Sequence, residues 1–89
     1  MRRLRIEWDE DSVDYIARHG VEPEEVEELL VRRHLWHRGR AGRYEALGRS
    51  AAGRYLMAVL AQRGPHAYRV VTARDMTDSE RKPFRRRMP

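Results

Sequence analysis

Polar and apolar residues alternate at the start of the chain and then adopt a helical spacing. Residues 4–8 alternate with a period of two, which predicts a strand with one buried face. An acidic run begins at Asp9, and carboxylates stabilise the first turn of a helix because they oppose its dipole. We therefore expect a helix over about residues 10–19, whose apolar face consists of Val13, Ile16 and Ala17.

A second helix is predicted directly after the first. Gly20 ends the first helix, because glycine readily takes a positive φ after a helix. Pro23 suits the first turn of the next helix, where its missing N–H is no loss. We expect this helix over about residues 23–33, with an apolar face made of Val26, Leu29 and Leu30.

Glycines then divide the middle of the chain at a spacing typical of hairpins. Between them we expect four strands, over residues 34–38, 43–49, 54–62 and 68–73. Thr77 and Glu80 have the spacing of a capping box, which opens a C-terminal helix. Pro83 lies too far inside that helix to be a first-turn proline, so we expect a kink or an end near Lys82.

These elements follow the order β-α-α-β-β-β-β-α. The order predicts an α+β fold, in which the helices pack on a twisted and mostly antiparallel sheet. No linker or repeat divides the chain, so we expect one domain over residues 1–89, with a basic tail over about 81–89.

The composition excludes several classes of protein. The 89 residues include no cysteine, which excludes a disulfide framework and a thiolate zinc site. The longest apolar run, residues 56–61, is too short to span a bilayer. The basic residues 1–5 are not followed by the apolar stretch of a signal peptide. We therefore expect a cytoplasmic protein without a membrane partner.

Charge is divided unevenly along the chain. Residues 1–30 carry four arginines and ten acidic residues, a net charge of −6, whereas residues 31–89 carry fifteen basic and four acidic residues, a net charge of +11. A segment this basic favours a polyanion such as RNA or DNA. Eighteen of the nineteen basic residues are arginine, as an arginine-rich genome would also produce. A solvated surface or a site for an acidic partner therefore stays as the alternative, and the acidic residues 22–28 are an alternative docking face for a basic partner.

Arginines stand on successive predicted strands, at Arg43, Arg49, Arg54, Arg69 and Arg74. If the strands pair in order, several guanidiniums converge on one sheet face, and their planar geometry suits a phosphate. Arg69 and Arg74 are an odd number of residues apart, so a regular strand would direct them to opposite faces. We expect Arg74 to leave the end of the strand and reach back.

Histidines and aromatic residues are the other candidates for chemistry. His19 can exchange a proton near neutral pH, although a histidine there also suits the end of a helix. His34 and His37 point to opposite faces of a strand and lack a third ligand at motif spacing, so we expect no metal. Aromatic rings can stack on RNA bases, but this core needs most of them; they are Trp8, Trp36, Tyr44, Tyr55, Tyr68 and Phe84.

Several of these residues occur in an order that resembles the BrnT family, toxins of bacterial type II toxin–antitoxin modules. The matching segments are Trp8-Asp9, His19-Gly20-Val21, residues 43–49, residues 69–77 and Glu80-Arg81. The resemblance covers about residues 5–85 and is most specific over residues 70–81.

The resemblance implies a RelE-like fold and a metal-independent ribonuclease that needs no cofactor and blocks translation. It also implies a cognate antitoxin of ribbon-helix-helix type, and a complex that represses its own operon by binding operator DNA. The family's positions fall on His19, Arg43, Arg69, Arg74 and Glu80. The chain departs from the family pattern at Arg18, at Gly42, where an acidic residue is common, and at Pro83-Phe84, where a tyrosine is usual.

Cleavage of RNA without a metal uses the 2′-hydroxyl of the substrate as the nucleophile, and it needs a base, an acid and cations. We expect His19 or Glu80 to be the base and His19, when cationic, to be the acid. Arg43, Arg69 and Arg74 would hold the phosphate, and RNA would also contact Arg49, Arg54 and Arg81. The alternative is an inactive toxin homologue, a non-catalytic module that binds nucleic acid or a partner and acts in operon repression.

Overall fold

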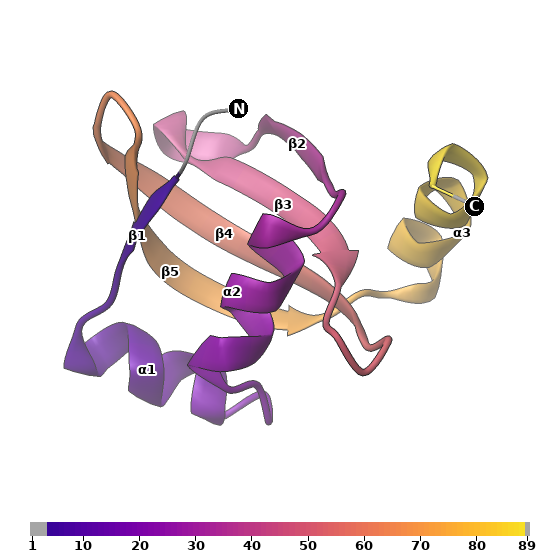
Figure 1. Ribbon diagram of the computed structural model, residues 1–89, viewed down its shortest axis with the longest axis horizontal. Helices are drawn as coiled ribbons and strands as arrows, with labels where there is room; N and C mark the ends of the chain where they lie inside the picture. The colour runs from indigo at the N-terminus through magenta and orange to yellow at the C-terminus, as the bar shows by residue number, and fades with distance from the viewer. Residues whose placement is uncertain (1–3, 89) are drawn as a thin grey trace.

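The computed structural model describes residues 4–88, in which five strands form one sheet accompanied by three helices (Figure 1). The elements are β1 Arg5–Glu7, α1 Glu10–Ala17, α2 Pro23–Val31, β2 Leu35–Arg38, a 3-10 turn Arg40–Gly42, β3 Tyr44–Arg49, β4 Tyr55–Gly64, β5 Ala67–Asp75 and α3 Asp78–Arg87. This confirms the α+β class. The observed ends of the helices and strands differ from the predicted ends by at most two residues in every element except α3. Residues 1–3 and 89, which the predicted domain and basic tail include, lie outside the described residues.

The sheet has the strand order β1-β5-β4-β3-β2. β2, β3, β4 and β5 pair antiparallel in that sequence, but β1 pairs parallel with β5. The sheet is therefore mixed, which corrects the expectation of an antiparallel one at its β1 edge. Parallel neighbours need a long connection, and here α1, α2 and the three other strands separate β1 from β5.

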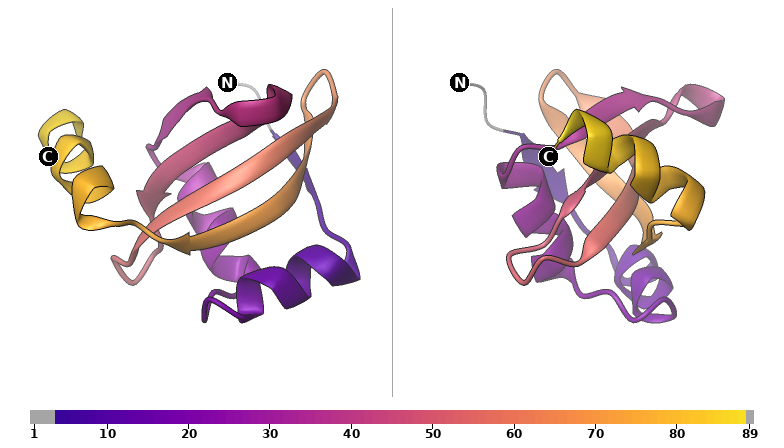
Figure 2. Two further views of the ribbon diagram at one scale, coloured as in Figure 1. Left: turned by 180° about the vertical axis from the view of Figure 1, so that it is seen from behind. Right: turned by 90° about the vertical axis from the view of Figure 1, so that its right-hand side faces the viewer.

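Helices α1 and α2 cover one face of the sheet, as Figures 1 and 2 show. Their buried residues Ile16, Val26 and Leu29 pack against Leu56 and Leu60 of β4. The predicted packing of these helices on the sheet is confirmed. Four of the aromatic candidates also pack in or against this core: Trp8, Trp36, Tyr44 and Tyr68. The rings of the last three contact one another, with centroids 4.9 to 5.7 Å apart.

Helix α3 lies at one end of the sheet, beyond the opposite face (Figure 2). A second apolar cluster joins it to the sheet through the buried residues Leu47, Met57, Met76 and Phe84. Of the predicted kink or end near Lys82, the end is wrong, because α3 continues through Pro83 to Arg87, and the kink stays a prediction. Burial of Phe84 directly after Pro83 anchors the helix. Pro83 has no N–H to donate to the carbonyl of Ser79, four residues earlier, but Ser79 is exposed, so water can donate instead.

Candidate functional site

One face of the sheet carries most of the predicted site. Alternate residues of a strand point to opposite faces, and Leu56, Ala58 and Leu60 of β4 belong to the core under α1 and α2. We call the other side the open face; its residues on β4 are Tyr55, Met57, Val59 and Ala61. Within the described chain, α3 touches this face only at the end near Tyr55 and Met57.

A bulge in β5 places two of the predicted arginines on the open face together. The register of β4 with β5 shifts between Val59 and Leu60, so that Val71 is an extra residue in β5. The extra residue reverses the alternation, and Arg69 and Arg74 therefore point to the same face. This corrects the expectation that a regular strand would separate them.

The register divides the open face into two ends. At what we call the uncovered end, Arg69 lies beside Ala61 of β4. Tyr44 pairs with Leu60, so Arg43, the residue before Tyr44, lies on the other side of Ala61. At the covered end, under α3, Arg74 lies beside Met57. Counted along β4, four residues, or about 13 Å, separate the positions beside Arg69 and Arg74.

Arg74 and Glu80 form an ion pair at the covered end. The Arg74 nitrogens Nη1 and Nη2 donate to Glu80 Oε1 and Oε2 at 2.8 and 2.9 Å. Glu80 also accepts the backbone N–H of Thr77 at 2.9 Å, which completes the predicted capping box. The hydrogen bond from Arg74 lowers the pKa of Glu80, and a carboxylate with a lowered pKa is a weaker base.

Arg54 is engaged on the helix side of the sheet. Its Nε donates to Asp75 Oδ1 at 2.7 Å and its Nη1 donates to the carbonyl oxygen of Gly20 at 2.7 Å. It also pairs with Glu25 of α2 at 3.2 Å. Its hydrogen bond lowers the pKa of Asp75. Arg54 thus joins the loop after α1, helix α2 and the end of β5, and RNA binding by Arg54 stays a prediction.

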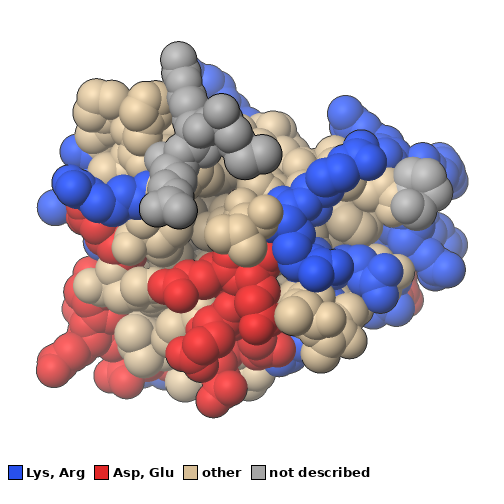
Figure 3. Space-filling model, viewed as in Figure 1, with Lys and Arg blue, Asp and Glu red and all other residues tan. Residues whose placement is uncertain are grey.

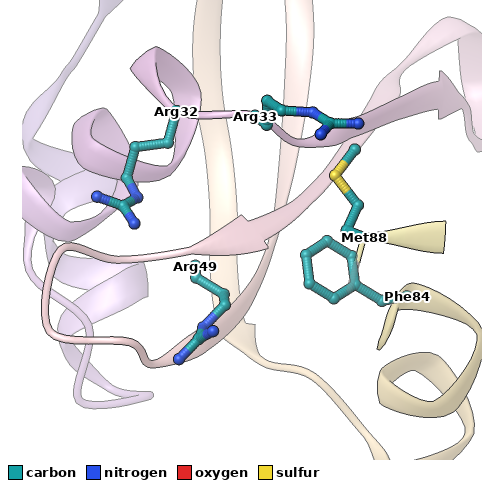
Figure 4. A pocket seen from close by; sticks show the side chains of 5 residues that line it. All are labelled: Arg32, Arg33, Arg49, Phe84 and Met88. Atoms are coloured by element: carbon teal, nitrogen blue, oxygen red, sulfur yellow. The ribbon is translucent and has the colours of Figure 1, made fainter. Parts of the chain in front are cut away.

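Arg49 and Arg81 flank one aromatic ring at the covered end. Their guanidinium carbons lie 4.8 and 5.1 Å from the centre of the Tyr55 ring, and Phe84 meets the same ring edge-on. Beside them is an open groove of about 370 Å³ (Figure 4), lined by Arg32, Arg33, Arg49, Phe84 and Met88. Both predicted RNA contacts therefore belong to a basic and partly aromatic surface.

His19 lies apart from the uncovered end. It follows α1, and its carbonyl oxygen is 3.4 Å from Arg54 Nη2. Arg54 in turn binds Asp75, the last residue of β5, whereas Arg69 lies near the start of that strand. The structure therefore brings together Arg43 with Arg69, and Arg74 with Glu80, but places His19 with neither pair on the open face.

Glu45 was not among the residues predicted from the sequence to act in the site, and His37 was considered there only as a possible metal ligand. The two residues are cross-strand partners, and their side chains approach to 3.7 Å between Nε2 and Oε1. Alternation along the predicted strand at residues 43–49 would have placed Glu45 on the same face as Arg43. Among residues 4–88, no group of three or more possible metal-ligating side chains occurs, and no helix is long and apolar enough to cross a membrane.

Charge in three dimensions follows the division along the chain. Acidic side chains gather over α1 and α2, whereas basic ones gather towards α3 (Figure 3). Asp9, which caps α1, contacts Arg69 at 3.4 Å, so acidic and basic surfaces meet beside the uncovered end. The pKa of Asp9 is lowered, first by hydrogen bonds from Ser12 and then by the charge of Arg69.

Comparison with known proteins decides the family. Residues 8–80 match the family model described as ribonuclease toxin, BrnT, of type II toxin-antitoxin system. The chain belongs to the BrnT family. Its structure is similar to the crystal structure of the Brucella abortus ribonuclease toxin BrnT, with a TM-score of 0.68 and 23% identity over 85% of this chain and 100% of that one. The resemblance noted in the sequence is thereby confirmed, and a search of curated proteins found no match.

Proposed function

We propose that this BrnT-family protein is an endoribonuclease toxin that cleaves RNA at the uncovered end of the open face. The observation that carries the proposal is the bulge at Val71, because it directs Arg69 to the same face as Arg43. These two arginines lie on either side of Ala61, whose methyl group leaves the surface between them shallow. Among residues 4–88, no side chain forms an ion pair with Arg43, and Arg69 has one exposed partner, Asp9.

The spacing of the strands suits one phosphate between the two arginines. Neighbouring strands lie about 4.8 Å apart, so the backbones at Arg43 and Arg69 lie about 10 Å apart across Ala61. Guanidinium groups on these side chains can approach a phosphate above Ala61 from both sides. Two such groups stabilise the charge that develops on phosphorus when the 2′-hydroxyl attacks, which is the part a metal ion plays in other nucleases.

We further propose that Arg74 and Glu80 are positioning residues. Their ion pair fixes α3 against the end of β5, beside the path of the neighbouring RNA phosphate. The basic groove beside Arg49 and Arg81 continues the RNA path past the covered end. In this proposal the fold is RelE-like, because two helices cover one face of a largely antiparallel sheet and leave the other face to the substrate.

The proposed partners follow from the family and from the charge. The type II toxin–antitoxin family implies a cognate antitoxin. We propose that the antitoxin is of ribbon-helix-helix type, covers the basic open face in competition with RNA, and brings the complex to operator DNA. Cleavage of messenger RNA in the cytoplasm would then inhibit translation whenever the antitoxin is scarce.

Expression in a bacterium with and without the neighbouring gene tests this proposal. We expect growth arrest and new RNA 5′-hydroxyl ends, both relieved by the neighbouring gene and both absent for Arg69→Ala. Arg85→Ala, a change of an exposed arginine on α3, is the matched control and should remain toxic. Normal growth with unchanged RNA would contradict the proposal and favour the non-catalytic binding module.

A further inference from the structure

A histidine–glutamate pair lies next to the proposed phosphate position on the open face. His37 of β2 pairs with Glu45 of β3, and Glu45 pairs in turn with Val59 of β4. Arg43 directly precedes β3 in extended backbone, two residues before Glu45, so both side chains point to the same face, with backbones about 7 Å apart. The pair therefore borders the shallow surface between Arg43 and Arg69.

The two side chains are near each other and accessible to a substrate. His37 Nε2 lies 3.7 Å from Glu45 Oε1, and the side chains are 52% and 33% exposed. A proton can pass between two such groups after a small rotation of either side chain. Neither group is held by a buried network, in contrast to Glu80, whose two oxygens both bind Arg74.

Gly39 makes room for the Glu45 carboxylate. A Cβ atom at Gly39 would lie 3.1 Å from both Cγ and Oε2 of Glu45, closer than most side chains tolerate. The φ of Gly39 is −107°, a value that any residue adopts, so the backbone conformation does not require glycine there. The space that Gly39 leaves is therefore what admits Glu45 to its position beside His37.

Three arginines share the open face with this pair. Arg43 directly precedes the strand of Glu45, and Arg69 and Arg74 lie on the same face two strands away. The pKa of Arg74 is raised chiefly by its hydrogen bond to Glu80 and in smaller part by the charge of Glu45. Glu45 is thus a carboxylate on this face that lies near the arginines without a bidentate contact to one of them.

We propose that Glu45 is the general base and His37 the general acid of the RNA cleavage, an inference that rests on the proposed ribonuclease function. Glu45 takes the proton of the 2′-hydroxyl while the 2′-oxygen forms a bond to phosphorus. The bond from phosphorus to the 5′-oxygen breaks, and the His37 imidazolium gives its proton to that oxygen. The products are a 2′,3′-cyclic phosphate and a 5′-hydroxyl, and the proton then passes from Glu45 to His37 to restore both groups.

Two versions of one short oligoribonucleotide test these roles, one with oxygen and one with sulfur at the 5′ bridging position of a single cleavage site. A thiolate leaves without being protonated, so only the sulfur substrate bypasses the acid. We expect His37→Gln and Glu45→Gln each to cut the oxygen substrate at least about 100-fold more slowly than the wild type. On the sulfur substrate, His37→Gln should come within a few-fold of the wild type, whereas Glu45→Gln should stay slow.

Controls separate this inference from the proposed function. His66→Gln and Glu24→Gln replace exposed residues of the same types away from the pair and should cut both substrates like the wild type. Unfolding curves of the two test variants should match that of the wild type, because both side chains are partly exposed and each variant replaces one polar side chain by another. Full activity of His37→Gln on the oxygen substrate would overturn this inference and leave the proposed function standing. The same holds if His19→Gln, and not His37→Gln, is slow on the oxygen substrate and regains the wild-type rate on the sulfur substrate. If the wild type cuts neither substrate, the proposed function fails and this inference with it.

Discussion

The two ends of the open face use the same residue type in different ways. At the covered end, Arg74 is bound by Glu80, and Arg49 and Arg81 pack on the Tyr55 ring. At the uncovered end, Arg43 and Arg69 flank Ala61, with Glu45 and His37 at its border. One end holds α3 to the sheet, and the other presents cations to solvent.

This difference shows that the role of an arginine in a basic chain depends on which carboxylates lie next to it. Arg54 and Arg74 each have a carboxylate within 2.8 Å, so their charge is already balanced inside the protein. Arg69 meets Asp9 only at 3.4 Å, in an exposed pair that contributes little to stability. Loss of the first kind of arginine should therefore destabilise the fold, and loss of the second kind should weaken phosphate binding.

The largest expected effect on stability is at the covered end. Phe84 is 3% exposed, and Phe84→Ala should lower the free energy of unfolding by about 3 kcal/mol, because it leaves a cavity between α3 and the sheet. Val31→Ala, a truncation at a residue that is 85% exposed, is the control and should change it by less than about 0.5 kcal/mol. Urea titration checks both. A loss below about 1 kcal/mol for Phe84→Ala would show that the covered end does not depend on α3.

The largest expected effect on activity is at the uncovered end. Arg69→Ala and Arg43→Ala should each lower the rate of RNA cleavage about 100- to 1000-fold, because each removes a cation from the phosphate in the transition state. Their midpoints of thermal unfolding should stay within about 2 °C of the wild type. Single-turnover cleavage and a thermal scan provide the two measurements. If either variant has a lowered midpoint of thermal unfolding but still cleaves RNA at the wild-type rate, the uncovered end stabilises the fold and does not bind the phosphate.

Arg54 should behave as a residue of the fold. Arg54→Met leaves Asp75, Glu25 and the carbonyl of Gly20 without their donor, which should destabilise the protein by about 2 kcal/mol. For a domain of this size, the midpoint of thermal unfolding should fall by about 8 to 16 °C. Arg43→Met is the matched control and should melt like the wild type. If Arg54→Met is as stable as that control but no longer binds RNA, Arg54 belongs to the RNA site.

The smallest expected effect is on the pH dependence of stability. The pKa of Glu80 is lowered in the folded protein by its hydrogen bond to Arg74. A lowered pKa adds stability above the pKa of the unfolded state, about 4.3 for a glutamate, and this stability is lost as the pH falls through the folded value. Glu80→Gln should therefore be less stable than the wild type by on the order of 1 kcal/mol near neutral pH, and the difference should shrink below about pH 4.

Urea unfolding at several pH values checks this last prediction. The pKa values of Asp9 and Asp75 are also lowered, so the wild type itself should lose stability in acid. Glu24→Gln, a change of an exposed carboxylate in α2, serves as the control. A constant difference between Glu80→Gln and the wild type from neutral to acidic pH would mean that the ion pair with Arg74 contributes nothing.

Local signals in the sequence were enough to predict most of the elements. The change from a period of two to a helical period marks the passage from β1 to α1, and Gly20 with Pro23 marks the break between α1 and α2. Thr77 and Glu80 located the start of α3 through the capping box, which the structure contains. Pro83 was misleading, because the burial of Phe84 that keeps α3 intact is a tertiary contact.

The arrangement of the site depended on features with no local signal. Val71 lies in a run of β-branched residues that is typical of a regular strand, so its bulge is visible only from the register with β4. Arg54 and Asp75 are 21 residues apart in the chain, and their pairing depends on how β4 and β5 align. The pairing of β1 with β5 is likewise set by the path of the long connection. The roles of the predicted site residues stay predictions.

The most direct test of the central claim is the chemistry of the ends formed when purified protein meets a short labelled RNA. The account predicts 2′,3′-cyclic phosphate and 5′-hydroxyl ends that form in the presence of a metal chelator. It also predicts that the Arg43→Ala/Arg69→Ala double variant, which should remain folded, forms none. Intact RNA with the wild type, or 3′-hydroxyl and 5′-phosphate ends, would contradict the account.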